Sequence, residues 1–263
     1  MQNNQIKYIN SLKLSKFRKL FHEFVAEGDK LVIELLKSRF EISNIYAFAE
    51  WIEQNEQLLK TSKVNVTQIS SKELERISSL STPNNALTVV KIPKPEIIPD
   101  NIFSNLILIL EEIQNPGNLG NIIRTADWFG IKHIICSENC VDIYNPKVVQ
   151  ATMGSITRVS VLYKNPERVL AGKPKQIKVY GTLLKGKNIY NKNLSKNGII
   201  LIGNESKGIS GKLLPFITDK ISIPSFPKTT GKTQSPESLN ASVATAIVCA
   251  EFRRQYLFGN KVT

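Results

Sequence analysis

The sequence is poor in the residues that build disulfide frameworks and metal sites. Its 263 residues include three cysteines, Cys136, Cys140 and Cys249, and two histidines, His22 and His133. An odd number of cysteines in a chain of this length indicates a reducing compartment rather than a disulfide-stabilised secreted domain. Cys136-x-x-x-Cys140 has no second ligand pair, and the histidines are not spaced as in a metal motif, so we expect no zinc site.

Long apolar runs are missing as well. The longest, Leu106–Leu110, is far too short to cross a bilayer. The N-terminal residues are polar and include lysine, without the apolar core of a secretory signal. We therefore expect a cytoplasmic protein that has no membrane-spanning segment.

Charge is the unusual feature of the composition. The hydrophobic fraction of 41% is ordinary for a globular protein, but the formal net charge is +13. Residues 1–99 carry 14 Lys and Arg against 11 Asp and Glu, whereas residues 100–263 carry 21 against 11. This excess favours a polyanionic partner, of which nucleic acid is the usual one. A lysine-rich proteome would produce the same excess, so the charge alone does not identify the partner.

Residues 1–93 alternate between helical and extended patterns and predict a small α+β domain. We expect helices at 7–20, 31–37, 50–59 and 71–77, and strands at 42–48, 64–68 and 87–91. The basic helix over 7–20 is either a solvated helix face or a contact for phosphates. Its cations are Lys13, Lys16, Arg18 and Lys19. Three prolines in residues 92–100 predict a linker, which we place at 94–104.

Residues 105–263 predict an α/β domain, because short apolar runs alternate with helical patterns. The unbroken apolar run Leu106–Leu110 is typical of a buried parallel strand. Further strands are expected at 134–136, 159–162, 178–182, 199–202 and 221–223, and helices at 122–129, 147–153 and 241–255. Asn115–Gly120 is predicted to be a turn, and Gly130 to end the helix that follows it.

Three stretches of this second part could carry chemistry. They are Asn115–Asp127, Gly203–Gly208, and Ser238-Leu239-Asn240 after Ile223-Pro224. The glycines and the helix start of the first stretch would let an anion approach backbone N–H groups. That stretch fits neither the Walker pattern nor the dinucleotide fingerprint. Each stretch alone also has a structural explanation: a tight turn, a solvated turn and a helix N-cap.

In this order and spacing, the three stretches together resemble the motifs of the SpoU/TrmH family of RNA ribose 2′-O-methyltransferases, within the SPOUT class. NLGNIIRTADWFG is similar to the first motif, LIGNESKGI to the second, and ISIP…SLNASVATAIVCAEFRRQ to the third. YNPKVVQATMGSI resembles the family's connecting helix, and the similarity covers residues 106–255. Through FVAEGDKLVIELL and ISSLSTPNNALTVV, residues 10–93 resemble the small substrate-binding domain that often precedes the family's catalytic domain.

The resemblance implies an α/β fold of two domains. A small α+β, ribosomal-protein-like domain at 1–93 would be followed, after the linker 94–104, by a SPOUT domain at 105–263 with a mostly parallel sheet and a deep trefoil knot. It further implies S-adenosylmethionine as cofactor, no metal, and a homodimer formed through the knotted domain. The implied catalytic and RNA-contacting residues are Asn118, Arg124, Glu205, Ser238 and Asn240. The implied cofactor-binding residues are Thr182, Gly203, Ile223 and Leu239.

The residue types suit this chemistry. A ribose 2′-hydroxyl must lose its proton as it attacks the methyl group, but no histidine lies near the motifs to accept it. A guanidinium stays protonated at neutral pH, so we expect Arg124 to hold a phosphate and polarise the ribose. A phosphate oxygen or water would then take the proton. Asn118 and Asn240 would position the groups, and Glu205 would orient Arg124 or the ribose.

One segment departs from the family pattern. Residues 225–237 lengthen the loop between Ile223-Pro224 and Ser238 by several residues. This segment is either a surface insertion, which loops tolerate well, or a lid over RNA or cofactor that carries Lys228 and Lys232.

We therefore predict an S-adenosylmethionine-dependent enzyme that methylates a ribose 2′-hydroxyl in structured RNA. A separate α+β domain that grips the shape of RNA favours ribosomal RNA. Transfer RNA is the alternative substrate. A non-catalytic RNA-binding or ribosome assembly factor on the same scaffold is the alternative outside enzymes, because fold does not fix function. A generic phosphate-binding α/β protein would leave the third motif unexplained.

Overall fold

The computed structural model describes residues 1–94, 97–226 and 238–258. The chain forms two compact units, one of Met1–Pro95 with Asp142–Arg158 and one of Glu96–Val141 with Val159–Thr263. The first division along the chain follows Pro95 and falls within the predicted linker 94–104. The segment Asp142–Arg158, which we had predicted as part of the second domain, packs with the first unit instead.

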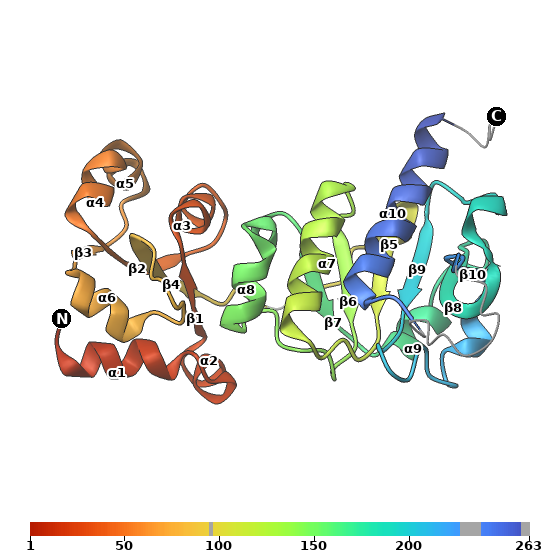
Figure 1. The fold of residues 1–263 in the computed structure, drawn as a ribbon, viewed down its shortest axis with the longest axis horizontal. Coiled ribbons are helices and arrows are strands. Elements are labelled where there is room, and N and C mark those ends of the chain that lie inside the picture. The colour runs from red at the N-terminus through yellow and green to blue at the C-terminus, as the bar shows by residue number, and fades with distance from the viewer. Residues whose placement is uncertain (95–96, 227–237, 259–263) are drawn as a thin grey trace. The chain divides into compact units, whose positions relative to one another are not determined.

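The first unit is a four-stranded mixed sheet covered by helices on both faces (Figure 1). Its strands β1 (Glu23–Glu27), β2 (Ile42–Ala47), β3 (Val66–Gln68) and β4 (Ala86–Lys91) lie in the order β1-β4-β2-β3. The strand β4 is antiparallel to both neighbours, and β2 is parallel to β3. This is the small α+β domain that the sequence predicts.

Among the described residues, seven α-helices belong to the first unit. They are α1 (Asn3–Ser11), α2 (Ser15–Phe21), α3 (Asp29–Leu36), α4 (Ala49–Gln54), α5 (Glu56–Ser62), α6 (Ser71–Ile77) and α8 (Pro146–Thr152), and η2 (Ser155–Thr157) is a short 3-10 helix. Val25, Leu87 and Val89 pack with residues of α1 and α6. Ile45 and Ala86 pack with residues of α3, α4 and α5. Alternate residues of each strand therefore build a core on each face of the sheet.

The second unit is a six-stranded sheet in which every pairing is parallel. Its strands lie in the order β10-β8-β9-β5-β6-β7. They are β5 (Leu106–Leu110), β6 (His133–Cys136), β7 (Ser160–Tyr163), β8 (Val179–Asn188), β9 (Gly198–Ile202) and β10 (Asp219–Ser222). All residues of β5 and β9 are buried, as their unbroken apolar sequences predict. The predicted α/β class with a parallel sheet is confirmed.

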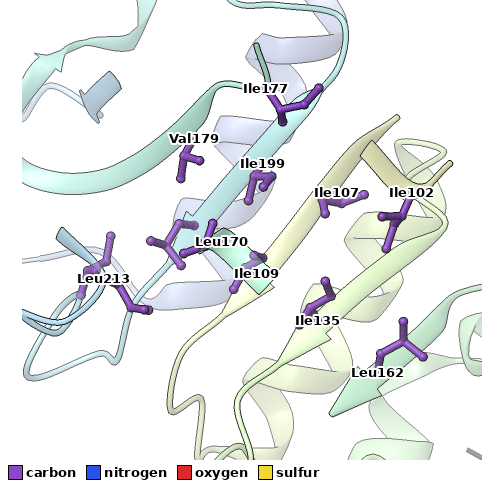
Figure 2. Close-up of a cluster of buried hydrophobic side chains, with 12 residues drawn as sticks. Ile102, Ile107, Ile109, Ile135, Leu162, Leu170, Ile177, Val179, Ile199 and Leu213 are labelled. Atoms are coloured by element: carbon purple, nitrogen blue, oxygen red, sulfur yellow. The ribbon is translucent and has the colours of Figure 1, made fainter. Parts of the chain in front are cut away.

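Helices cover both faces of this sheet. They are α7 (Pro116–Trp128), α9 (Pro166–Ala171) and α10 (Ala241–Phe258), with the 3-10 turns η1 (Ile102–Ser104), η3 (Ile189–Asn191) and η4 (Leu214–Phe216). On one face, Ile107 and Ile109 pack with Leu170 of α9 (Figure 2). On the other face, α7 and α10 pack against each other, and the ring of Phe252 in α10 meets that of Tyr180 with centroids 4.9 Å apart.

Several predicted boundaries are wrong, each for a local reason. The helix α7 begins at Pro116, six residues before the predicted start at Ile122, because Asn115 caps it and proline suits the first helical position. The predicted turn Asn115–Gly120 is therefore mostly helix. The expected helix at 7–20 divides into α1 and α2, and the one at 50–59 into α4 and α5.

Smaller details of the sequence interpretation are settled by the structure. The N-cap of α6 is Ser70, so Glu73 falls at the third helical position and completes a capping box. Gly130, which we expected to end α7, has φ +63°, the left-handed conformation that glycine adopts readily after a helix. None of the described helices has the length and apolar character needed to cross a membrane.

Candidate active site

Three side chains, one from each predicted motif, form a hydrogen-bonded cluster at the carboxyl edge of the parallel sheet. The side-chain amide of Asn118 in α7 donates to the carboxylate of Glu205, which follows β9. The amide oxygen of Asn118 accepts a hydrogen bond from Nδ2 of Asn240, just before α10, at 2.9 Å. The structure thus brings together residues that are 87 and 122 positions apart in the chain.

The direction of these hydrogen bonds is fixed by the start of α10. Oδ1 of Asn240 accepts from the backbone N–H of Ser242 at 2.9 Å and from its hydroxyl at 2.7 Å. Because this oxygen caps the helix, only the NH₂ group of Asn240 can face Asn118. The NH₂ group of Asn118 then faces Glu205. The cluster is a one-way chain of donors from Asn240 through Asn118 to Glu205, and Asn118 within it is only 6% exposed.

The loop that carries Glu205 is held in shape by its neighbours. Oδ1 of Asn204 accepts from the backbone N–H groups of Ser206 and Lys207 at 2.9 and 3.1 Å, and Nδ2 of Asn204 donates to the carbonyl of Glu112 at 2.9 Å. Gly203 lies so close to Gly208 that an added Cβ would sit 2.3 Å from its carbonyl carbon. The loop can therefore close only with glycine at position 203.

The turn after β5 supports that loop. Glu112 has φ 52°, an uncommon conformation for a residue with a side chain. Its backbone N–H donates to the hydroxyl of Ser137 at 2.9 Å, and the N–H of Ile113 donates to Sγ of Cys140 at 3.3 Å. A hydrogen bond with Cys136 lowers the pKa of the Cys140 thiol to about 7. This buried thiol is placed to act as an acceptor that fixes the turn.

The other two cysteines are buried thiols as well. The hydrogen bond with Cys140, together with burial, raises the pKa of Cys136 well above its usual value. Burial raises the pKa of Cys249 to about 12. Within the described ranges, no cluster of three His, Cys, Asp or Glu side chains could hold a metal ion.

Arg124 lies on a different face of α7 from Asn118. Arg124 comes six positions after Asn118, and at ~100° per residue this places the two about 120° apart around the helix. The exposed side chain of Arg124 lines a cavity of about 440 Å³ between α7 and α10. The other lining residues are Asn121, Thr125, Trp128, Phe129, Ser242, Val243 and Ala246. Glu205 accepts a hydrogen bond from Asn118. This contact does not support the expectation that Glu205 orients Arg124.

The predicted cofactor residues come from adjacent strands. Thr182 follows the residues of β8 that pair with β9, Gly203 follows β9 and Ile223 follows β10, and these three strands are neighbours in the sheet. The hydroxyl of Thr182 donates to the carbonyl of Leu201 at 3.1 Å. Leu239 precedes Asn240 and is 47% exposed, and Ser238 is exposed beside it. These residues therefore collect at one edge of the sheet, together with the Asn118 cluster.

Some supporting residues escaped the sequence interpretation. Gly186 lets β10 approach β8, because a Cβ there would lie 2.4 Å from the carbonyl carbon of Ile221. Between Gly181 and Lys187, β8 departs from the regular register with β10. Asn204 could have been found, since asparagine after a strand and before a glycine-bearing turn often accepts hydrogen bonds from the next N–H groups. Ser137 and Cys140 carried no such local signal.

The predicted extension of the third loop cannot be assessed in the same way. Residues 227–237, with Lys228 and Lys232, lie outside the described residues. Ser225 and Phe226, at its start, are exposed.

A parallel α/β unit with polar loops gathered at strand carboxyl ends belongs to the class of α/β proteins that bind a ligand at this edge. Comparison with known families makes the assignment specific. Residues 105–250 match the SpoU rRNA Methylase family, and residues 3–88 match the MRM3-like substrate binding domain. The chain belongs to the SpoU rRNA Methylase family.

Relatives are similar over nearly their whole length. A 23S rRNA (guanosine(2553)-2′-O)-methyltransferase of Bacillus subtilis is 28% identical, over 96% of this chain and 97% of that protein. A putative RNA methyltransferase of the TrmH family from Porphyromonas gingivalis has a similar structure, with a TM-score of 0.81, 35% identity, and coverage of 97% and 99% of the two chains. An AdoMet-bound rRNA methyltransferase from Sinorhizobium meliloti has a TM-score of 0.82 at 28% identity, covering 96% and 95%.

Proposed function

We propose that this protein transfers the methyl group of S-adenosylmethionine to a ribose 2′-hydroxyl of ribosomal RNA in the cytoplasm. The observation that carries the proposal is the hydrogen-bonded cluster of Asn118, Glu205 and Asn240. Each of these residues comes from a different motif, and the cluster joins the three at one edge of the sheet. The relatives named as rRNA methyltransferases support ribosomal RNA as the substrate.

The residues at the strand ends suit this cofactor. S-adenosylmethionine supplies a methyl group activated by a positively charged sulfur. Ile223 and Leu239 are partly exposed apolar side chains that can contact an adenine ring, and the hydroxyl of Thr182 and the backbone of Gly203 are polar neighbours. An added Cβ at Gly208 or Gly211 would have no atom within 4 Å, so this loop leaves space beside it. We assign cofactor binding to Thr182, Gly203, Ile223 and Leu239.

The remaining site residues would act on the RNA. Arg124 is exposed, and the planar fork of donors in its guanidinium is suited to hold a phosphate next to the target ribose. Asn118 is held in place by its hydrogen bonds with Glu205 and Asn240, and in this fixed position its amide orients the incoming nucleotide. Ser238 is an exposed hydroxyl next to the cluster that can hydrogen-bond the ribose or its phosphate. A phosphate oxygen or water takes the proton, because the cluster contains no histidine to act as the base.

We also propose that two copies pair through the second unit and that its C-terminal part is knotted. The cavity between α7 and α10 is bordered by Trp128, which is 85% exposed, and by Val243, which is 47% exposed. Exposed apolar side chains beside a cavity favour an interface between proteins. The knot follows from membership of the SPOUT class. Part of the connection from β10 to α10 that would form it lies outside the described residues.

The proposal is tested by methyl transfer from radiolabelled S-adenosylmethionine to rRNA isolated from cells that lack this protein, with tRNA as the competing substrate. We expect incorporation into rRNA at a ribose 2′-oxygen. Incorporation into tRNA alone would assign the other substrate. Binding of RNA without cofactor binding or incorporation would mean a non-catalytic assembly factor.

A variant pair tests the role of Arg124. Arg124→Ala should reduce the rate of transfer by at least about 100-fold while cofactor affinity stays within about twofold, since the guanidinium acts on the RNA. Lys132→Ala is the control, because it removes an exposed positive charge from the same unit. Equal activity of both variants would remove Arg124 from the site.

A further inference from the structure

The short helix α2 concentrates positive charge and aromatic rings without any acid. Its sequence, SKFRKLF, has three cations and two phenylalanines in seven residues. Leu14 and Leu20 are 55% and 65% exposed, and Phe21 is 42% exposed. This combination of exposed apolar side chains and positive charge favours a partner that has both negative charge and flat apolar groups.

Two of the cations near this helix are engaged inside the unit and are not available to a partner. Arg18 is 2% exposed, donates to the carbonyls of Leu12 and Lys13 at 3.0 and 2.9 Å, and pairs with Asp142 at 2.5 Å. The ammonium of Lys13 donates to the carbonyl of Ser78 at 2.8 Å, and burial lowers its pKa. Our expectation that Arg18 could contact phosphate is therefore wrong, because its role is to anchor α2.

The two other cations of α2 are exposed on a helix that ends in an exposed aromatic ring of fixed orientation. They are Lys16 and Lys19, and the ring is that of Phe21. The ring of Phe21 stacks on that of Phe17 with centroids 6.1 Å apart and 10° between the planes. Tyr8 meets Phe21 edge to face at 5.1 Å, and the ammonium of Lys16 lies 4.7 Å from the centre of the Phe17 ring. The orientation of Phe21 is thus set before any ligand binds.

We propose that this α2 surface, made of Lys16, Lys19 and Phe21, binds an unpaired stretch of the RNA substrate. One base stacks on Phe21, and the adjoining phosphates contact the two lysines. An exposed aromatic side chain on a helix that also carries exposed lysines favours single-stranded RNA, because duplex RNA does not expose base faces for stacking. The match of residues 3–88 to a substrate binding domain supports RNA over a protein or a membrane as the partner. The inference rests on the proposed function, and it assigns the RNA contact to a specific surface.

The test uses the full-length protein and a fluorescein-labelled oligoadenylate of about 20 nucleotides, with a duplex of the same length for comparison. Phe21→Leu should weaken binding of the single strand by about tenfold and binding of the duplex by less than twofold. Phe21→Trp should restore binding, because it returns an aromatic face. Replacing Lys16 and Lys19 with glutamine should reduce the slope of log affinity against log salt by about 1.4 for two phosphates on a single strand.

A matched control carries the same charge change on the same unit. Lys60 on α5 and Lys72 on α6 are exposed lysines outside the α2 surface, and their double replacement with glutamine should leave the salt slope within about 0.3 of the wild type. Equal losses for single strand and duplex in Phe21→Leu, or equal slopes for both lysine pairs, would overturn the inference. Methyl transfer to rRNA by the wild type is measured in parallel. If transfer occurs while the α2 variants bind normally, the inference fails and the proposed function stands.

Discussion

The strongest test of the site geometry is to replace the NH₂ group that Asn118 donates to Glu205 with an oxygen that cannot donate. In Asn118→Asp the NH₂ group that faces Glu205 becomes a carboxylate oxygen, so two carboxylates meet at hydrogen-bond distance. At an effective dielectric constant of ~20, two unit charges ~4 Å apart repel by about 4 kcal/mol. We expect the variant to lose about 3 kcal/mol of unfolding free energy at pH 8, where both groups are charged in the unfolded chain.

The loss should depend on pH in a defined direction. A pair of adjacent carboxyl groups keeps one proton in the folded state, so one pKa of the pair is raised above its unfolded value. The folded state then binds more protons than the unfolded state, and stability falls as pH rises through that interval. Relative to the wild type, the variant should therefore recover most of its stability between pH 8 and pH 5, since a shared proton replaces the lost hydrogen bond.

Urea unfolding of the wild type and the variant at both pH values measures the effect. Asn121→Asp is the matched control, because it introduces the same charge one turn further along α7 on an exposed side chain. It should change stability by less than about 0.5 kcal/mol. If the two variants lose the same free energy at pH 8, or if the Asn118→Asp loss is the same at pH 5, Asn118 does not face Glu205 as the structure indicates.

Three further predictions concern the supports of the two units. Gly203→Ala should lower cofactor affinity and cost about 1–3 kcal/mol of stability, because its Cβ would lie 2.3 Å from Gly208, whereas Gly211→Ala, with no atom within 4 Å, should change neither when both are measured by calorimetry. Arg18→Met should cost about 3–5 kcal/mol in urea unfolding, since it leaves Asp142 without its partner, and a loss below 1 kcal/mol would contradict the anchoring of α2. Hydrogen bonds from Arg254 lower the pKa of Glu251 below 4.5, so the carboxylate stabilises the fold above that pH and the contribution is lost as pH falls through the folded pKa. The thermal midpoint of Glu251→Gln should therefore lie below that of the wild type at pH 7, and the difference should shrink as the pH is lowered through the acid range; a constant difference would argue against this ion pair.

Much of the architecture could be predicted because it depends on local patterns. The run Leu106–Leu110 is apolar at every position, and only a strand covered on both faces accepts such a sequence. The extended patterns over 42–48 and 87–91 gave strands within one residue of those observed. Helix starts were less predictable. For α7 the cap at Asn115 and Pro116 was present in the sequence, but the glycines that follow suggested a turn and outweighed it.

The sequence by itself determined the small α+β part, the parallel sheet and the three motifs, because residue type and spacing alone carry that information. Only the tertiary structure decided that Glu205 bonds Asn118, that Arg124 faces a separate cavity, and that Asp142–Arg158 completes the first unit. It also decided which cations of the basic N-terminal segment are buried and which reach solvent. The physical reason is that a side chain's partner is set by the packing of segments distant in the chain. Arg18 and Lys19 are adjacent in sequence, yet Arg18 is buried and forms an ion pair with Asp142, whereas Lys19 is exposed to solvent.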